Sequence, residues 1–133
     1  MTIQDKAEQL AKVNRQANAI LAGIRKQTNI DAKFIEEQLK KFIRIKLMLT
    51  ENEVSDNITL MVQISIAKSL NVKVTELPGI DKPGQCGNAS AVLAKRIQLF
   101  LAVQKGLNVS IPAKKTPVIK TVHDLTSVLM PLM

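Results

Sequence analysis

The sequence predicts an all-α fold, and its composition and its apolar spacing support this prediction. Apolar residues make up 46% of the 133 residues, yet the chain has only three Phe, no Trp and no Tyr. A core of this kind is built from Ile, Leu, Val, Met and Ala, which suits packed helices better than a sandwich of strands. Apolar residues also recur every three or four positions along most of the chain, as on one face of a helix. A chain of this length fits one compact domain with an appended element.

Residues 1–50 are expected to form an antiparallel helical hairpin. The first helix, over residues 3–26, has one apolar stripe made of Ile3, Ala7, Leu10, Val13, Ala17, Ile20, Leu21 and Ile24. Thr28 and Asn29 interrupt this helix, and Asp31 is placed to cap the next one. The second helix carries Phe34, Ile35, Leu39, Phe42, Ile43 and Leu47. The short break between the two helices favours the hairpin.

A third helix is predicted to begin near residue 54. Thr50 and Glu53 have the spacing of a capping box, and Ser55 or Asp56 offers a competing cap, so the start of this helix stays open. The run that follows, up to Leu70, is apolar almost all round and is too long for an ordinary strand. We therefore expect a central helix with neighbours on several faces.

The second half of the chain contains a long loop and two further helices. Residues 77–88 are too rich in Pro and Gly for a regular element. A helix bearing Ser90 follows, and Gly106 is the expected C-cap that ends it. Thr121, with Asp124 three residues later, predicts the start of a short last helix.

The order of motifs in this half resembles the acyl carrier protein family. Gly87-Asn88-Ala89-Ser90 opens a helix, Ile111-Pro112 lies in the next loop, and Thr121-Val122-His123-Asp124-Leu125 begins the last helix. The resemblance covers about residues 62–129. It implies a small all-α helical bundle to which the N-terminal hairpin is an extra element. The expected division is a hairpin extension at 1–50 and an acyl-carrier-like helical domain at 51–133.

The resemblance implies a non-catalytic carrier of acyl or aminoacyl groups. Ser90 matches the serine that bears 4′-phosphopantetheine, and a phosphodiester on the first turn of a helix is favoured by the helix dipole. The family has Asp where this chain has Ala89, and no acidic residue lies between Ser90 and Pro112. Lys95 and Arg96 are therefore the predicted partner-binding residues. The partners implied are acyl- or aminoacyl-transferring enzymes with an acidic docking face.

Signatures of an enzyme or a metal site are missing from the sequence. It has no Gly-rich phosphate loop and no paired cysteines, and His123 is its single histidine. We therefore predict neither catalytic residues nor metal ligands, and we assign His123 to a surface or capping role. Cys86 is interpreted as an incidental thiol, because only Lys82 nearby in sequence could lower its pKa.

The formal net charge of +8 supports an alternative function. In this alternative the chain is a basic helical interaction module that binds nucleic acid or an acidic protein face without a prosthetic group. The chain's three Phe offer no aromatic platform on which bases could stack, and the best base-contacting cluster, Asn14-Arg15-Gln16 with Asn18, is small.

The single cysteine, Cys86, indicates a reducing compartment, and no segment is apolar enough to span a bilayer. A cytoplasmic location is therefore expected. The apolar stripe of the hairpin must be covered, either by the carrier-like part or by a second copy of the chain, so the oligomeric state stays open.

Overall fold

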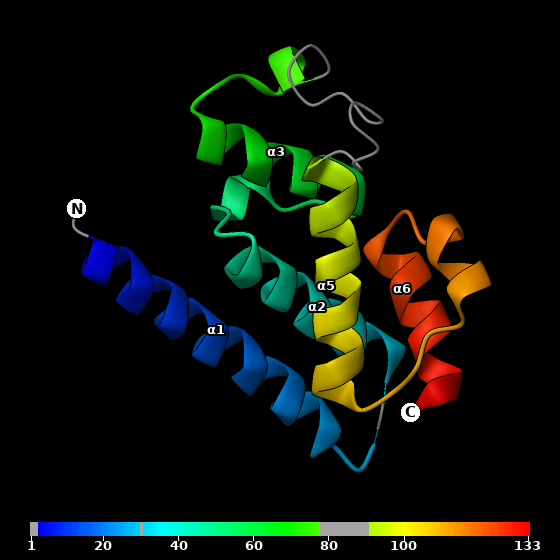
Figure 1. Ribbon diagram of the computed structural model, residues 1–133. Coiled ribbons are helices and arrows are strands. Elements are labelled where there is room, and N and C mark those ends of the chain that lie inside the picture. Colours follow the sequence, from blue (N-terminus) through cyan, green and yellow to red (C-terminus); the bar gives the residue numbers. More distant parts are fainter. Residues whose placement is uncertain (1–2, 30, 78–90) are drawn as a thin grey trace.

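The computed structural model describes residues 3–29, 31–77 and 91–133, and these residues form a bundle of helices (Figure 1). The α-helices are α1 (Ile3–Arg25), α2 (Ala32–Lys46), α3 (Ile58–Leu70), α5 (Ala91–Leu107) and α6 (Val122–Leu129). Short 3₁₀ helices lie between and after them: η1 (Glu51–Glu53), η2 (Val74–Glu76), η4 (Ala113–Val118) and η5 (Met130–Leu132). No strand occurs within the described ranges, so the predicted all-α class is confirmed.

The two N-terminal helices form the predicted hairpin, and the cap at the start of α2 is the predicted one. The carboxylate of Asp31 accepts a hydrogen bond of 3.1 Å from the backbone N–H of Lys33. In Figure 1, α1 and α2 run side by side over the C-terminal part of α1, where the two helices make their contact. The hairpin therefore follows from local signals that the sequence displays.

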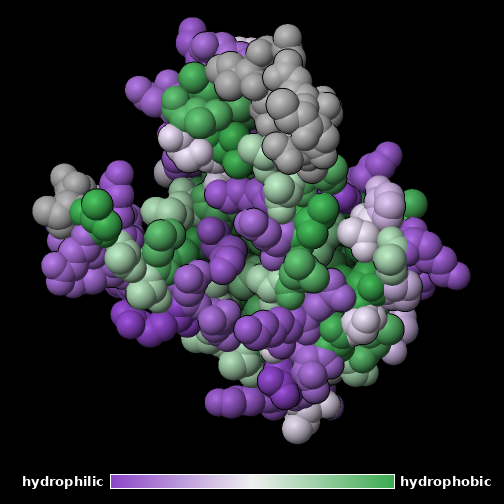
Figure 2. Space-filling view, in the orientation of Figure 1, coloured by the Kyte–Doolittle hydropathy of each residue, from purple (hydrophilic) through white to green (hydrophobic). Residues whose placement is uncertain are grey.

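The N-terminal part of α1 extends beyond its partner. Helix α1 has 23 residues and α2 has 15, so α1 is longer by about 12 Å at the usual rise per residue. Ile3 and Leu10 are 89% and 55% exposed, whereas the C-terminal half of the stripe is buried at Ala17, Leu21 and Ile24. The predicted apolar stripe is thus covered over half its length only, because α2 ends too early to cover the rest. Figure 2 shows this end of α1 standing out from the rest of the molecule.

Helix α3 is capped by Asn57, whereas the capping box of Thr50 and Glu53 belongs to η1 and neither Ser55 nor Asp56 caps α3. The side-chain oxygen of Asn57 accepts a hydrogen bond of 2.9 Å from the N–H of Leu60. Ser55 accepts instead from the N–H of Asn57, at 3.2 Å. Asp56 accepts from the N–H of His123, 67 positions away, at 3.1 Å. Asp56 does not cap α3 because its carboxylate already accepts a hydrogen bond at the start of α6.

The starts of α3 and α6 are held together by backbone hydrogen bonds. The N–H of Ile58 donates to the carbonyl of Lys120 at 3.0 Å, and the N–H of Val122 donates to the carbonyl of Asp56 at 2.9 Å. These bonds form an isolated antiparallel bridge between two segments far apart in sequence. Two helix N-termini are thereby fixed at one end of the bundle.

The last helix begins as predicted, with a capping box. The hydroxyl of Thr121 accepts from the N–H of Asp124 at 2.9 Å, and the Asp124 carboxylate accepts from the N–H of Thr121 at 3.1 Å. Hydrogen bonds from the N–H groups of Lys120 and Thr121 hold the pKa of the Asp124 carboxyl below its usual range. The local sequence therefore sets both the position and the electrostatics of this helix start.

Gly106 does not end α5, in contrast to the prediction. The helix continues to Leu107, and Asn108 adopts the left-handed conformation, with φ of 55°. A Cβ atom placed on Gly106 would lie 2.2 Å from Cδ1 and 2.9 Å from Cβ of Leu21. Gly106 is therefore explained by the close approach of α1, and not by helix termination.

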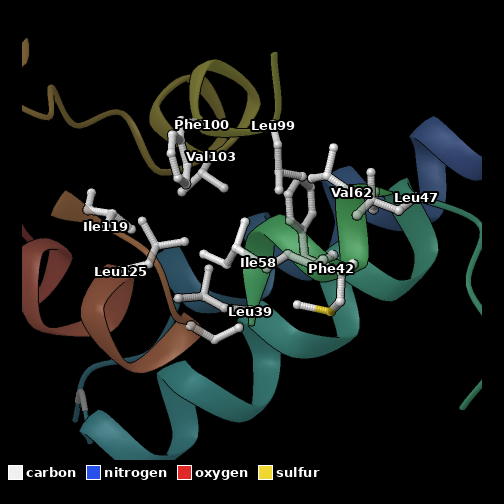
Figure 3. Close-up of a cluster of buried hydrophobic side chains, with 14 of the residues drawn as sticks. Leu39, Phe42, Leu47, Ile58, Val62, Leu99, Phe100, Val103, Ile119 and Leu125 are labelled. Atoms are coloured by element: carbon white, nitrogen blue, oxygen red, sulfur yellow. The ribbon is translucent and has the colours of Figure 1, made fainter. Parts of the chain in front are cut away.

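One hydrophobic core joins the five α-helices of the described ranges. Figure 3 shows buried side chains that point toward one another from α2, α3, α5, α6 and the turn before α6. The labelled members are Leu39, Phe42, Leu47, Ile58, Val62, Leu99, Phe100, Val103, Ile119 and Leu125. Residues from 1–50 and from 51–133 therefore share a single core.

Candidate functional site

The predicted attachment residue Ser90 lies outside the described residues, as do Cys86 and the rest of the segment 78–90. Helix α5 begins at Ala91, the residue that follows Ser90 in the sequence. The candidate site is therefore made of the residues of α5 and of the elements that pack against them.

Arg96 is directed inward, toward the chain itself. Its guanidinium donates hydrogen bonds to the carbonyl of Thr116 at 3.1 Å and to the carbonyl of Ile119, both in or next to η4. The same group lies over the ring of Phe100, 4.9 Å from the centroid. Partial burial lowers the pKa of Arg96, yet a guanidinium keeps its charge at neutral pH. Its donors therefore hold η4 against α5.

A groove lies beside the first turns of α5, close in sequence to Ser90. It has a volume of about 460 Å³ and is lined by Asn57, Thr59, Val92, Leu93, Arg96, Pro117 and Lys120. We call it the α5–η4 groove. Its lining combines apolar side chains with two cations, and the bridge between the starts of α3 and α6 fixes its walls. Such a lining suits an anionic group attached to an alkyl and amide arm.

Lys95 faces a different groove, although it is adjacent to Arg96. This second groove, of about 620 Å³, is lined by Lys6, Gln9, Leu10, Lys46, Leu47, Met48, Ser65, Lys68, Ser69 and Lys95. We call it the lysine groove. Burial lowers the pKa of Lys95, and the nearby charge of Lys46 lowers it further. The two residues predicted together as a partner-binding pair thus lie in different environments.

Helix α5 also exposes an apolar stripe that was not singled out from the sequence. Leu93, Ile97 and Leu101 are 42%, 44% and 58% exposed, and they follow one another at four-residue spacing. Residues so spaced lie on one face of a helix. Figure 2 shows hydrophobic side chains along α5 on the visible face. The spacing is present in the sequence, but α5 is apolar on most sides, so pattern alone could not tell the exposed face from the buried one.

The lysine groove was also missed, for a different reason. Its lysines come from four helices, at positions 6, 46, 68 and 95, and no local spacing connects them. Only the packing of α1 against α2, and of α5 against both α1 and α3, brings them to one concave surface. A signal of this kind cannot be read from one sequence window.

Metal binding and membrane spanning find no support in the described ranges. No group of three or more His, Cys, Asp and Glu side chains there could hold a metal ion. Within the same ranges no helix combines the length and the apolar character needed to cross a bilayer. His123, predicted as a surface or capping residue, has a side chain that is 70% exposed, and its Nδ1 lies 3.5 Å from Oε2 of Glu36.

Comparison with known proteins gives no relative of this chain: no protein-family model, no curated protein and no solved structure matches it. The two grooves, the exposed face of α5 and the sequence motifs are therefore the features on which a function can be proposed.

Proposed function

We propose that this protein is a non-catalytic carrier that bears 4′-phosphopantetheine on Ser90 and presents an acyl or aminoacyl group to partner enzymes. The proposal is carried by the order of elements after Ser90 in the sequence: α5, described from Ala91 over 17 residues, is followed by η4 and α6. The same order of attachment serine, long helix, loop and short closing helix is the basis of the sequence resemblance to acyl carrier proteins. A carrier needs no base or nucleophile of its own.

The α5–η4 groove supports the proposal because its residues suit the group. Lys120 and Arg96 place positive charge beside the first turns of α5, which favours a phosphodiester there. Val92, Leu93 and Pro117 offer apolar surface to the arm. When bound, the group would supply a thiol that carries the cargo as a thioester. The chain's own residues would bind and orient the arm.

The exposed face of α5 is the proposed docking surface for partner enzymes. Leu93, Ile97 and Leu101 form an apolar stripe beginning three positions after Ser90, within reach of any enzyme that acts on a group attached there. Lys95 stays a candidate for contact with an acidic partner, whereas one terminal nitrogen of the Arg96 guanidinium already donates to the backbone carbonyls of Thr116 and Ile119. The preferred partners are acyl- or aminoacyl-transferring enzymes with an apolar docking surface and acidic residues beside it.

Modification of Ser90 tests the carrier proposal directly. Co-expression with a broad-specificity phosphopantetheinyl transferase should raise the intact mass by one arm. Ser90→Ala should abolish the gain, whereas the matched variant Ser110→Ala, at an exposed serine outside the motif, should keep it. Failure of several transferases to modify the full chain would contradict the carrier proposal.

The alternative, a basic module that binds nucleic acid or an acidic protein face, is favoured by one observation. Four lysines line the lysine groove, and no acidic residue is among the described residues that line it. Retention on DNA or RNA that falls steeply with salt would support this function. Retention that does not depend on salt would argue against it.

A further inference from the structure

The lysine groove is a concave site between the two parts of the chain. Its walls come from the N-terminal part of α1, the C-terminal ends of α2 and α3, and α5 near Lys95. Its volume of about 620 Å³ lies within the range of small-molecule sites in proteins. Figure 2 shows hydrophilic side chains between α1 and α5 on the visible face.

The charges at this groove are unevenly compensated. The ammonium of Lys68 lies 2.8 Å from the carboxylate of Glu53, so its charge is balanced. Lys46 donates to the amide oxygen of Asn14 at 2.8 Å, and a neutral amide leaves its charge in place. Neither Lys46 nor Lys95 has a carboxylate partner within the described part of the chain. The charge of Lys46 disfavours the charged form of Lys95, and an anion placed between the two ammonium groups would relieve that repulsion.

The floor of the groove is apolar and offers few free polar groups. Leu10, Leu47 and Met48 line it, and Leu10 and Met48 are 55% and 44% exposed. The hydroxyl of Ser65 is buried and donates to the carbonyl of Leu47 at 2.9 Å, and that of Ser69 donates to the carbonyl of Ile66 at 2.7 Å. A ligand therefore gains contact area here chiefly through an apolar body.

We propose that the lysine groove binds a single-chain amphiphile with an anionic head group, of the chemical class of a free fatty acid. The head group lies at the ammonium groups of Lys46 and Lys95, and the alkyl chain lies along Leu10, Leu47 and Met48. A polyanion such as nucleic acid would use the cations but leave the apolar floor uncovered. This binding is independent of a prosthetic group on Ser90.

Titration calorimetry on the full chain with three probes tests the proposal. Laurate, kept below its micelle concentration, should bind with a stoichiometry of one. Dodecyltrimethylammonium has an alkyl chain of the same length and the opposite charge, and butyrate has the same head and a short chain, so both should fail to bind. Equal binding of laurate and dodecyltrimethylammonium would overturn the proposal, as would no binding of laurate.

Matched variants locate the site. The double substitution of Lys46→Gln and Lys95→Gln should weaken laurate binding by at least about tenfold, since two charge-assisted contacts are lost. Lys114→Gln with Lys115→Gln removes the same charge from exposed positions on η4 and should leave the affinity unchanged. Equal losses in both double variants would show general charge attraction and would overturn the assignment to this groove.

A second pair of variants tests the apolar contact. Leu10 and Leu101 are almost equally exposed, at 55% and 58%, but only Leu10 lines the lysine groove. Leu10→Asp should abolish laurate binding, and Leu101→Asp should preserve it. If an oligonucleotide bound through Lys46 and Lys95 while laurate did not, the groove would be a nucleic-acid contact instead. Ser90→Ala should keep laurate binding, so failure of the carrier proposal leaves this one standing.

Discussion

Arg96 is a residue that the sequence predicts at the surface but that the fold uses for internal hydrogen bonds. It lies next to Lys95 in a helix without acidic residues, a pattern that favours a solvated or partner-binding face. Its guanidinium instead bonds two carbonyls of the segment around η4 and covers Phe100. Arg96 therefore acts together with the buried side chain of Ile119 to hold the segment around η4 against the bundle.

Replacement of Arg96 by methionine should therefore destabilise the fold. Arg96→Met keeps the apolar stem but leaves the carbonyls of Thr116 and Ile119 without their donor, which should cost about 2–3 kcal/mol. Lys105→Met, at an exposed position of the same helix, is the matched control and should change the free energy of unfolding by less than about 0.5 kcal/mol. Urea denaturation of both variants measures the difference, and equal effects would argue against the structural role.

Gly23 and Gly106, the glycines of the described helices, give a second residue-scale prediction. Gly106→Ala would press a methyl group into Leu21, so we expect a loss of about 1–3 kcal/mol. A Cβ atom placed on Gly23 would have no neighbour within 4 Å, and Gly23→Ala should stabilise α1 by about 0.5–1 kcal/mol. Thermal unfolding of the pair should therefore show shifts of opposite sign. A stabilising Gly106→Ala would mean that α1 and α5 pack less closely than the structure has it.

At the scale of elements, the ion pair between Glu53 and Lys68 links η1 to α3, and its contribution to stability depends on pH. The carboxylate of Glu53 accepts from Lys68 at 2.8 Å and from the N–H of Thr50 at 2.8 Å. The Lys68 ammonium, followed by the Thr50 N–H, lowers the pKa of Glu53 from its ordinary value of 4.5. A carboxyl whose pKa is lower in the folded state stabilises that state at pH values above its pKa in the unfolded chain. This contribution is lost as the pH falls through its pKa in the folded state.

Glu53→Gln should therefore destabilise the protein at pH 7 by less than about 1 kcal/mol, because the pair lies at the surface. The difference from the unsubstituted chain should shrink as the pH falls below about 4.5. Glu51→Gln, in the same 3₁₀ turn, is the matched control. Denaturant midpoints measured across this pH range check the sign, and a difference that grew in acid would contradict the assignment.

The exposed stripe of α5 gives a prediction about recognition. Ile97→Glu places a charge in the middle of the stripe, and Gln98→Glu adds the same charge at the next exposed position. If the stripe docks partner enzymes, Ile97→Glu should slow modification of Ser90 by a transferase about tenfold or more, with little effect on stability. Gln98→Glu should react at close to the original rate. Equal rates for both variants would show that the stripe is not the docking surface.

A helix boundary could be predicted from the sequence where neighbouring residues determine it, and could not where a distant residue does. The caps at Asp31 and Thr121 are set within three residues of the helix they start, and both are confirmed. The sequence leaves the cap of α3 open, and Asn57 is not among its candidates; Asp56, one of them, bonds the N–H of His123 across the bundle. The prediction that Gly106 is a C-cap was wrong, because the glycine is needed where Leu21 of α1 leaves no room for a side chain. The lysine groove could not be predicted for the same reason, since it exists only after four helices pack.

At the scale of the whole molecule, the hairpin is part of the core and not an appendage to it. Leu39 and Phe42 of α2 lie among buried residues of α3, α5 and α6 (Figure 3). Leu21 of α1 lies against Gly106 of α5. Residues 51–133 would therefore expose a large apolar surface when residues 1–50 are removed.

Two truncations separate the buried part of the hairpin from its exposed end. Removal of residues 1–50 deletes many buried side chains, so the fragment 51–133 should lose cooperative unfolding and become prone to aggregation. Removal of residues 2–12 deletes no buried position among the described residues, since 3–12 are all exposed, and should leave the denaturation midpoint nearly unchanged. Circular dichroism with denaturant and analytical ultracentrifugation compare the two. The opposite result is a fragment 51–133 that is monomeric and shows cooperative unfolding at the same denaturant midpoint as the full chain. That result would show that residues 51–133 have a sufficient core without the hairpin.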